Sequence, residues 1–479
     1  GSVPPIGVDA RDVEDVQVAV KFAAEKNLRL VIKNTGHDYL GRSSGRNGFM
    51  IWTHHLKNIT YNETFVPEGA SATEFYQALT LGAGVQWREA YSAAQRNNRY
   101  VVGGISDDGS VGAAGGWIGG GGHSALSPKY GLGVDNAIQF TIVTANGDHV
   151  TTNAYSHPDL FWALRGGGAG TYGIVTSVTY KTYPIEPLVV GFITANFTSI
   201  EVAKSVGIEF LKLQPKVSDA HWGGYSAYNK NNFYFLLVAP NATIDQANAT
   251  VGPFLEHLKT TAGENNTQVV VAPVPSFYDV FNPDAVANAP SGSQVGHNVE
   301  VASRLYTRNL YETEPEKLVE AFLNMPGGGG CCDSVSLYLG TNVRLGCSCS
   351  LPNSHVSGGV VSQIDPESTG LNPAWRKSVG GLVATGVGWP DGASAADVQA
   401  KKDLLKQHID VLEGLEPGTG SYINEGSLYE PNSQWTHFGD HYDRLLEIKD
   451  HYDPEGLFVV ASGVGSERWD DGLKCQRDQ

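Results

Sequence analysis

The sequence predicts an α+β protein of two domains, and two observations lead to this prediction. The 479 residues are too many for a single hydrophobic core. Near Pro184 the chain also changes character: glycine-rich loops between short elements give way to longer strand-like runs that alternate with amphipathic helical runs. We therefore expect a domain boundary near residue 185, and a separate C-terminal segment from about residue 420.

The elements of the first part follow from periodicity and turn residues. Residues 12–27 have apolar side chains at helical spacing and acids in the first turn, which predicts a helix. Residues 28–34 and 49–56 are short apolar runs that predict buried strands. Residues 74–98 predict a strand followed by a helix, and Asn146-Gly147 predicts the turn of a β-hairpin.

Later elements follow from the same signals. Residues 157–184 predict a helix, a glycine loop and a strand. Beyond them, strand-like runs such as NNFYFLLVAP alternate with helical runs such as EVAKSVGIEFLKLQ. Residues 441–452 predict a helix that Asp453-Pro454 closes, and a strand is expected after it.

Composition narrows the classes of protein. A formal net charge of -17 argues against nucleic acid as a partner, and no apolar run approaches the roughly 20 residues needed to span a bilayer. Asn-x-Ser/Thr sequons favour a secreted, glycosylated protein. They lie at Asn58, Asn62, Asn196, Asn241, Asn248 and Asn265.

The cysteines fit the same compartment. Four of the five lie within residues 331–349, at Cys331, Cys332, Cys347 and Cys349, and Cys475 is the fifth. A zinc site is one alternative, but adjacent cysteines do not match the usual ligand spacing, so we expect disulfides. His437 and His441 have the spacing of two zinc ligands on a helix, but Gly439 interrupts that helix and no third ligand is evident. We therefore predict no metal site.

Three glycine-rich loops, at 36–45, 103–122 and 166–173, are the strongest signal of a ligand site. Bare backbone N–H groups in successive turns form anion-binding concavities, although glycines also serve tightly packed structural loops. Residues 168–173 match G-x-G-x-x-G, but a helix precedes them and a strand follows. This is the reverse of a dinucleotide-binding fingerprint, so we expect no NAD site.

These loops, taken together, resemble the FAD-linked oxidases of the vanillyl-alcohol oxidase superfamily. The closer resemblance is to the berberine-bridge-enzyme-like branch and its fungal isoamyl-alcohol-oxidase-like members. The matching blocks are LVIKNTGHDYLGRSSG, GSVGAAGGWIGGGGHSALSPKYGLGVDN, VTANGDHV, DLFWALRGGGAGTYGIVTSVT, SYIN and YDPEGLF.

The resemblance implies a two-domain flavoprotein with a discontinuous FAD-binding domain. Residues 1–185 and 420–479 would form that domain, and residues 186–419 an α+β substrate domain over the flavin. Because the family's usual first strands lie upstream of this chain, we expect that an N-terminal stretch is missing.

The resemblance also implies that His37 bonds covalently to the 8α-methyl group of FAD. Many relatives add a second bond from a cysteine three residues before a Val-Gly pair. Asp108 occupies that position here, so a single tether is expected. The implied cofactor-binding residues are Lys33, Asn34, Thr35, Gly36, His37, Asp38, Gly41, Ser43, Gly103, Ser106, Ser110, Gly112, Gly116, Gly122, His123, Tyr130, Asp135, Gly173, Ile174, Val175, Tyr422 and Asn424.

The substrate side follows the family less closely. In several relatives a carboxylate on a central strand accepts the substrate's proton, but the matching position here is Ala384. Tyr422 and Asn424 are the nearest matched polar residues, and strand alternation would point both to one face with Glu425 on the other. A tyrosine base at Tyr422, assisted by His123 or Asp108, is the resulting hypothesis, and it requires a lowered tyrosine pKa.

The function implied by the resemblance is that of a secreted oxidase. It would oxidise a small-molecule alcohol, pass the electrons to oxygen and release hydrogen peroxide. Three alternatives stay open: a flavin dehydrogenase, an oxidative cyclase of secondary metabolism, and a degenerate protein that binds FAD without turnover.

Overall fold

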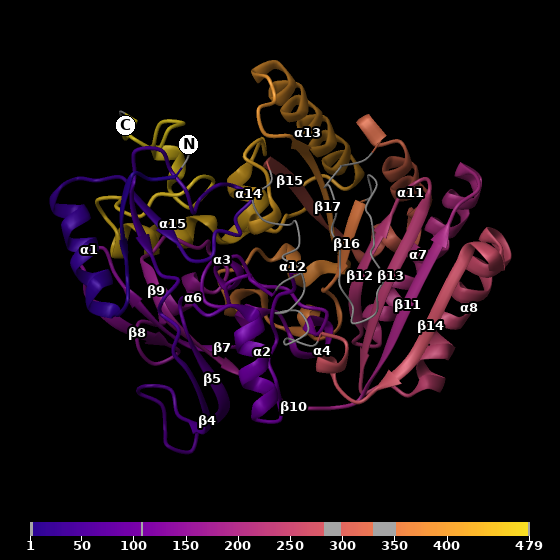
Figure 1. Cartoon of the computed structure of the whole chain (residues 1–479), viewed down its shortest axis with the longest axis horizontal. Coiled ribbons are helices and arrows are strands. Elements are labelled where there is room, and N and C mark those ends of the chain that lie inside the picture. The colour runs from indigo at the N-terminus through magenta and orange to yellow at the C-terminus, as the bar shows by residue number, and fades with distance from the viewer. Residues whose placement is uncertain (1–2, 107–108, 282–297, 329–350, 478–479) are drawn as a thin grey trace.

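The structure is a computed structural model, and it describes residues 3–106, 109–281, 298–328 and 351–477. Figure 1 shows two bodies side by side. One contains the N-terminal strands and helices together with the C-terminal segment, and the other is a large sheet flanked by helices. The predicted α+β class is confirmed. The domain limits at 185 and 420 stay predictions.

A small parallel sheet opens the chain. Its strands are β1 (Ile6–Asp9), β3 (Phe49–Trp52) and β2 (Leu30–Lys33), in that order across the sheet. Helix α1 (Val13–Glu25) covers the sheet, and the side chain of Asp12 caps it by accepting a hydrogen bond from Asp15 N. The apolar face predicted for this helix is the buried one.

A five-stranded antiparallel sheet completes the first body. Its order is β4-β5-β9-β7-β8, from β4 (Ile59–Phe65), β5 (Tyr76–Gly82), β7 (Ala137–Val143), β8 (His149–Asn153) and β9 (Ile174–Lys181). The hairpin predicted at Asn146-Gly147 joins β7 to β8, with Gly147 at φ 80°. The helices of this body are α2 (Trp87–Arg96), α3 (Gly116–Gly119), α4 (Ser127–Tyr130), α5 (Gly133–Asn136) and α6 (Pro158–Leu164). A short pair, β6 (Arg99–Tyr100) with β10 (Tyr183–Pro184), leads to the second body.

The second body is built on a seven-stranded antiparallel sheet. Its order is β14-β11-β13-β12-β16-β17-β15, from β11 (Leu188–Asn196), β12 (Gly223–Tyr228), β13 (Asn232–Pro240), β14 (Thr267–Val274), β15 (Asn298–Thr307), β16 (Leu351–His355) and β17 (Ser378–Trp389). The helices are α7 (Ile200–Asp219), α8 (Ile244–Ala262), α10 (Arg308–Thr313), α11 (Pro315–Leu323), α12 (Ala374–Lys377) and α13 (Ala395–Leu415).

Both faces of this sheet are buried, which explains its nearly continuous apolar strands. In β13, Phe233, Phe235 and Leu237 pack in a core with α7 and α8. The alternate residues Tyr234 and Leu236 belong to the core shared with the first body. The sheet therefore presents one face to its helices and the other to the loops of the first body.

The C-terminal segment returns to the first body (Figure 1). It contains α14 (Ser433–Phe438) and α15 (Tyr442–Tyr452), and α15 confirms the helix predicted there. The strand expected after Asp453-Pro454 does not form. The Asp453 carboxylate instead accepts hydrogen bonds from Leu457 N and Phe458 N, each 2.8 Å long, which fixes these residues in a turn.

Most of the cysteines lie in a segment that is not among the described residues. Cys331, Cys332, Cys347 and Cys349 lie outside the described residues, so the expected disulfides stay a prediction, and Cys475 is an exposed thiol. Among the described helices, none combines the length and the apolar character that a membrane crossing needs.

Candidate functional site

The main candidate site is a cavity where three loops of the first body meet, which we call the three-loop cavity. Its walls come from residues 34–43 after β2, residues 111–119 including α3, and residues 168–173 before β9. It occupies about 1020 Å³, counting its opening to solvent. These are the three glycine-rich loops that the sequence singled out.

Strand alternation in β2 sets the first wall. Ile32 and Asn34 face the cavity, whereas Lys33 between them does not line it. The Asn34 amide donates to the carbonyl of Ala83. Its Oδ1 atom is buried and, among the described residues, makes no hydrogen bond. An acceptor is therefore held at the cavity wall.

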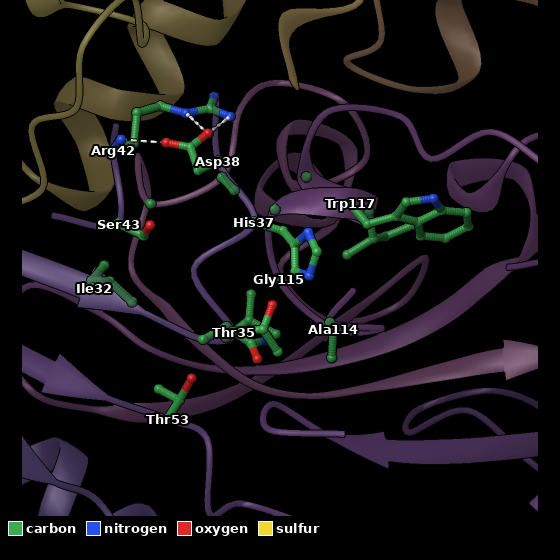
Figure 2. A pocket seen from close by; sticks show the side chains of 18 of the residues that line it. Ile32, Thr35, His37, Asp38, Arg42, Ser43, Thr53, Ala114, Gly115 and Trp117 are labelled. Carbon is green, nitrogen blue, oxygen red and sulfur yellow. Dashed lines mark hydrogen bonds and ion pairs between the residues drawn. The ribbon is translucent and has the colours of Figure 1, made fainter. Parts of the chain in front are cut away.

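His37 lies in the same wall, between the loop of Asp38 and Arg42 and the segment of Ala114 and Gly115 (Figure 2). Its Nε2 atom is 2.7 Å from the hydroxyl oxygen of Ser110, a residue of the second loop. This hydrogen bond ties the first loop to the second and fixes the orientation of the imidazole ring.

The same loop contains a buried ion pair between Asp38 and Arg42. The Asp38 carboxylate accepts bonds from Arg42 Nε at 2.9 Å and Arg42 Nη2 at 2.6 Å (Figure 2). The Arg42 Nη2 atom also donates to Asn424 Oδ1 at 2.9 Å, so the loop is joined to the C-terminal segment. Arg42 Nη1 is buried and has no partner among the described residues. The cationic Nη1 group is therefore a hydrogen-bond donor at the cavity to which no described residue is bonded.

The glycines of the second loop serve two different purposes. A Cβ atom on Gly112 or Gly115 would come within 2.9 Å of Asn34, so these glycines permit close packing of two loops. A Cβ atom on Gly116 would meet no atom within 4 Å, although the residue lines the cavity. Gly116 therefore offers bare backbone to the cavity.

The structure brings about half of the predicted cofactor residues to this cavity. Lining it are Asn34, Thr35, Gly36, His37, Asp38, Ser43, Gly112, Gly116, Gly173 and Val175. Outside the lining are Lys33, Gly41, Gly103, Ser106, Ser110, Gly122, His123, Tyr130, Asp135, Ile174, Tyr422 and Asn424. Asp108 lies outside the described residues.

Several residues outside the lining have evident structural partners. A Cβ atom on Gly103 would clash with Trp87, and one on Gly122 with Trp117, so both glycines accommodate indole rings. The Tyr130 hydroxyl donates to Glu186 at 2.6 Å. The Asp135 carboxylate pairs with Arg376 at 2.7 and 2.9 Å, with both side chains buried.

Sequence reasoning missed other lining residues. Arg42, Trp117, Ala169, Gly170 and Tyr172 all contribute to the cavity wall. Arg42 follows Asp38 by four residues in the same quoted loop, and that spacing was a signal for the ion pair.

The SYIN segment does not form the expected strand. Residues Ile423–Glu425 form a single 3₁₀ turn. The Asn424 amide donates to the Tyr422 hydroxyl at 2.8 Å and to the Gly116 carbonyl at 2.7 Å, so these two side chains do lie together beside the cavity. Glu425 was expected on the opposite face, but its Oε1 atom lies 3.2 Å from His123 Nε2. The turn, rather than strand alternation, decides these directions.

A tyrosine that acts as a base needs a lowered pKa, and Tyr422 does not have one. Burial, and then the negative charge of Glu425, raise the pKa of its hydroxyl well above the ordinary value for tyrosine. The hydrogen bond from Asn424 and the positive charge of Arg42 offset this only in part. Tyr422 is consequently a neutral phenol near neutral pH.

Ala384 lies on β17, a strand that has no acidic residue. Ala384 pairs with Ser303 across β15 and β17, and Ser303 Oγ accepts a hydrogen bond from Tyr422 N at 3.3 Å. The strand residue thus lies beside the SYIN segment, but it brings no carboxylate there.

The histidine pair near the C-terminus has other partners. His437 Nδ1 lies 2.9 Å from Ser421 Oγ, and His441 Nε2 lies 3.2 Å from Glu367 Oε1. Helix α14 ends at Phe438, before the second histidine. In the part of the chain that the structure describes, no group of three or more His, Cys, Asp or Glu side chains is placed to hold a metal ion.

Comparisons with known proteins agree with this geometry. Residues 4–153 match the family model described as FAD binding domain, and residues 421–465 match the one described as berberine and berberine like. An uncharacterised FAD-linked oxidoreductase of Arthroderma benhamiae is 37% identical over 99% of this chain and 80% of its own length. An FAD-linked oxidoreductase of Gibberella zeae, ZEB1, is 34% identical over 99% of this chain and 79% of its own.

Solved structures are similar over nearly the whole chain. The VAO-type flavoprotein MtVAO615 of Myceliophthora thermophila C1 has a TM-score of 0.83 and 30% identity, over 98% of this chain and 82% of that one. Berberine bridge enzyme of Eschscholzia californica has a TM-score of 0.75 at 17% identity, over 97% of this chain and 90% of that one, which is a likeness of fold.

The three-loop cavity fits FAD on its own features. Three separate loops enclose it, and backbone and polar groups line it alongside apolar side chains. In the described part of the chain, Asn34 Oδ1 and Arg42 Nη1 have no hydrogen-bond partner, and the backbone at Gly116 is open to the cavity. A large cofactor with an anionic pyrophosphate and a polar ring satisfies these groups.

Proposed function

We propose that this chain oxidises an alcohol with FAD bound covalently through His37. The chain belongs to the FAD-linked oxidoreductases of the vanillyl-alcohol oxidase superfamily, in the berberine-bridge-enzyme-like branch. The observation that carries the proposal is the position of His37, held by Ser110 in the wall of the cavity that fits FAD. A covalent bond prevents loss of the cofactor into a dilute medium, where mass action would favour dissociation. Bound FAD supplies the acceptor for a hydride from the substrate.

The chain's own residues would divide the remaining tasks. Arg42 and the backbone at Gly116 would bind the polar parts of the cofactor, and Asp38 holds Arg42 in place. Asn424 would fix the cofactor wall relative to the C-terminal segment through Gly116 and Arg42. Tyr422, a neutral phenol, would donate a hydrogen bond to the oxygen of the substrate.

The oxidase reaction is tested with purified protein, oxygen and a panel of alcohols. The panel contains 3-methylbutan-1-ol, benzyl alcohol and ethanol, and the measurements are oxygen consumption, peroxide formation and the flavin spectrum. We expect one hydrogen peroxide for each oxygen consumed. Flavin that an alcohol reduces but oxygen does not reoxidise would identify a dehydrogenase. Flavin that no alcohol reduces would refute the alcohol oxidase and favour a cyclase or a non-catalytic FAD-binding protein.

We also propose that the protein is secreted and glycosylated. The asparagines of all six sequons are exposed, as attachment of a glycan requires. Protein made in a eukaryotic secretory host should therefore migrate faster on electrophoresis after treatment with an endoglycosidase. The same chain made in a bacterial cytoplasm is the control. Unchanged mobility of the secreted protein would contradict the proposal.

A further inference from the structure

We propose that His123 is the catalytic proton acceptor of the alcohol oxidation and that Glu425 is its positioning residue. This inference rests on the proposed function. It assigns the step left open by the absence of an acid at Ala384 and by the neutral phenol of Tyr422.

The geometry of the pair supports this role. Glu425 Oε1 lies 3.2 Å from His123 Nε2, and the side chains are 26% and 12% exposed. A carboxylate can only accept a hydrogen bond, so it holds the imidazole in the tautomer that carries its proton on Nε2. The lone pair of the ring is then on Nδ1. That atom is buried and, among the described residues, has no hydrogen-bond partner. This is the arrangement of a carboxylate-oriented general base.

The surroundings place this base beside the cofactor wall. The ring of His123 meets Tyr422 edge-on at a centroid distance of 5.1 Å. Tyr422 accepts a hydrogen bond from Asn424, which in turn donates to the cavity-lining residue Gly116. His123 is therefore linked to the cavity through two side chains.

Aromatic rings enclose His123 on the side of the second body. Trp375 of α12 stacks on it at 6.4 Å, and Tyr225 of β12 lies at the same distance. Tyr225 belongs to the sheet face that packs against the first body. Aromatic rings interact favourably with one another, so benzyl alcohol is the probe chosen for this environment.

Among His123 and the titratable groups that contact its ring, His123 is the one suited to accept the substrate's proton. Glu425 is the charged partner, and Tyr422 and Tyr225 are the other titratable neighbours. Burial, and then Glu425, raise the pKa of both tyrosines, so neither takes up a proton as a phenolate near neutral pH. Arg42 acts on Tyr422 from the cavity side.

The proposed step balances. The hydroxyl proton of the alcohol passes to Nδ1 of His123, and the carbinol hydrogen passes to the flavin as a hydride with both electrons. The substrate becomes a carbonyl compound. Oxygen then takes up the two electrons and two protons and leaves as hydrogen peroxide. When the carbonyl product leaves, the proton on Nδ1 passes to water, and this restores the neutral ring with its proton on Nε2 beside Glu425.

The chain contains a matched comparison. His441 Nε2 and Glu367 Oε1 are also 3.2 Å apart, and Nδ1 of His441 is likewise buried without a partner among the described residues. That pair packs against Trp162, a residue far from the SYIN segment in the sequence, and neither pair is part of the cavity lining itself. The same hydrogen bond therefore occurs at two places, and the position beside Tyr422 distinguishes the proposed base.

The first experiment reads the tautomer without any turnover. Holoprotein labelled with ¹⁵N in its histidines is measured by NMR, with the His123 signals assigned by their loss in His123→Gln. We expect His123 to carry its proton on Nε2 in the wild type. Glu425→Ala should lose this preference, while Glu367→Ala should leave the His123 signals unchanged. A proton on Nδ1 in the wild type would overturn the proposal.

The second experiment measures flavin reduction by benzyl alcohol in a stopped-flow instrument. His123→Gln should slow reduction by roughly two to four orders of magnitude, the usual contribution of a general base. Glu425→Gln should slow it about 10- to 100-fold, with partial recovery in Glu425→Asp. Reoxidation by oxygen should be unchanged, and Glu367→Gln should match the wild type.

The outcomes separate this inference from the proposed function. Wild-type reduction rates in His123→Gln, with a normal flavin spectrum as evidence of folding, would overturn the role of His123. If no alcohol reduces the wild-type flavin, the alcohol oxidase fails, and with it the substrate assigned to this base. The tautomer measurement then still decides whether Glu425 orients His123.

Discussion

Replacing His37 with alanine is expected to release the flavin of this protein completely on denaturation. Wild-type protein precipitated with acid should keep its yellow colour and flavin fluorescence, because a covalent bond survives unfolding. His37→Ala should leave all its FAD in the supernatant. The native variant should still bind FAD, since the other cavity contacts, including Arg42 and the bare backbone of Gly116, are intact.

Gly116→Leu is the matched variant for this experiment. A Cβ atom at this position meets no neighbour within 4 Å and the residue lines the cavity, so we expect the leucine side chain to block FAD uptake. Peptide mapping of the wild type should find one flavin, on the peptide containing His37, and none on a cysteine peptide. Flavin that leaves the denatured wild-type protein would refute the covalent bond, and a cysteine adduct would refute the single tether.

The sequence predicted the parts of the site that are continuous along the chain. The strand ending at Lys33, the loop carrying His37 and the glycine segment around Gly112 were all recognisable, because local periodicity and turn chemistry determine them. The structure places these segments around one cavity. Lys33, which was also predicted to bind the cofactor, is not among the lining residues, as strand alternation between Ile32 and Asn34 indicates.

The glycine-dense segment shows why some assignments needed the structure. Gly116 leaves backbone open to the cavity, whereas Gly103 and Gly122 make room for the indole rings of Trp87 and Trp117. Both uses require the absence of a Cβ atom, so residue type alone does not separate them. Only the tertiary neighbours decide which glycines serve the ligand.

Long-range contacts were also beyond sequence reasoning. His123 and Glu425 are 302 residues apart, and the direction of Glu425 depends on a 3₁₀ turn in a segment that looked like a strand. The pKa of Tyr422 depends on burial and on the charges of Glu425 and of Arg42, which is 380 residues away in the sequence. Periodicity within one segment carries no information on such contacts.

The same C-terminal segment is anchored by a buried ion pair, which gives the last prediction. Arg304 on β15 forms a bidentate pair with Glu430, with bonds of 2.9 and 2.8 Å and side chains that are 1% and 0% exposed. Arg304 also reaches Glu413 on α13 at 3.1 Å, but that carboxylate is 41% exposed. Because Glu430 lies a few residues after Tyr422 and Asn424, the pair holds the SYIN segment against β15 of the seven-stranded sheet.

Glu430→Ala is expected to destabilise the protein by about 3 to 5 kcal/mol, because it leaves the Arg304 guanidinium buried without its main counter-charge. Glu413→Ala should cost less than about 1 kcal/mol, since water screens the exposed partner. The two variants remove the same chemical group from the same arginine. Thermal unfolding of the holoprotein, compared between the variants, measures the difference. Equal losses for both would show that burial does not set the strength of this pair.

The double variant Arg304→Met/Glu430→Met separates loss of charge balance from loss of packing. Two apolar side chains of similar size remove both buried charges at once, so much of the stability lost in Glu430→Ala should return. If the double variant is as unstable as the single one, the ion pair itself stabilises the contact between the SYIN segment and β15, and the unpaired arginine is not the cause of the loss.

The rate of flavin reduction by the substrate adds a functional measurement. A loosened SYIN segment moves Tyr422 and Asn424, so Glu430→Ala should slow flavin reduction more than Glu413→Ala does.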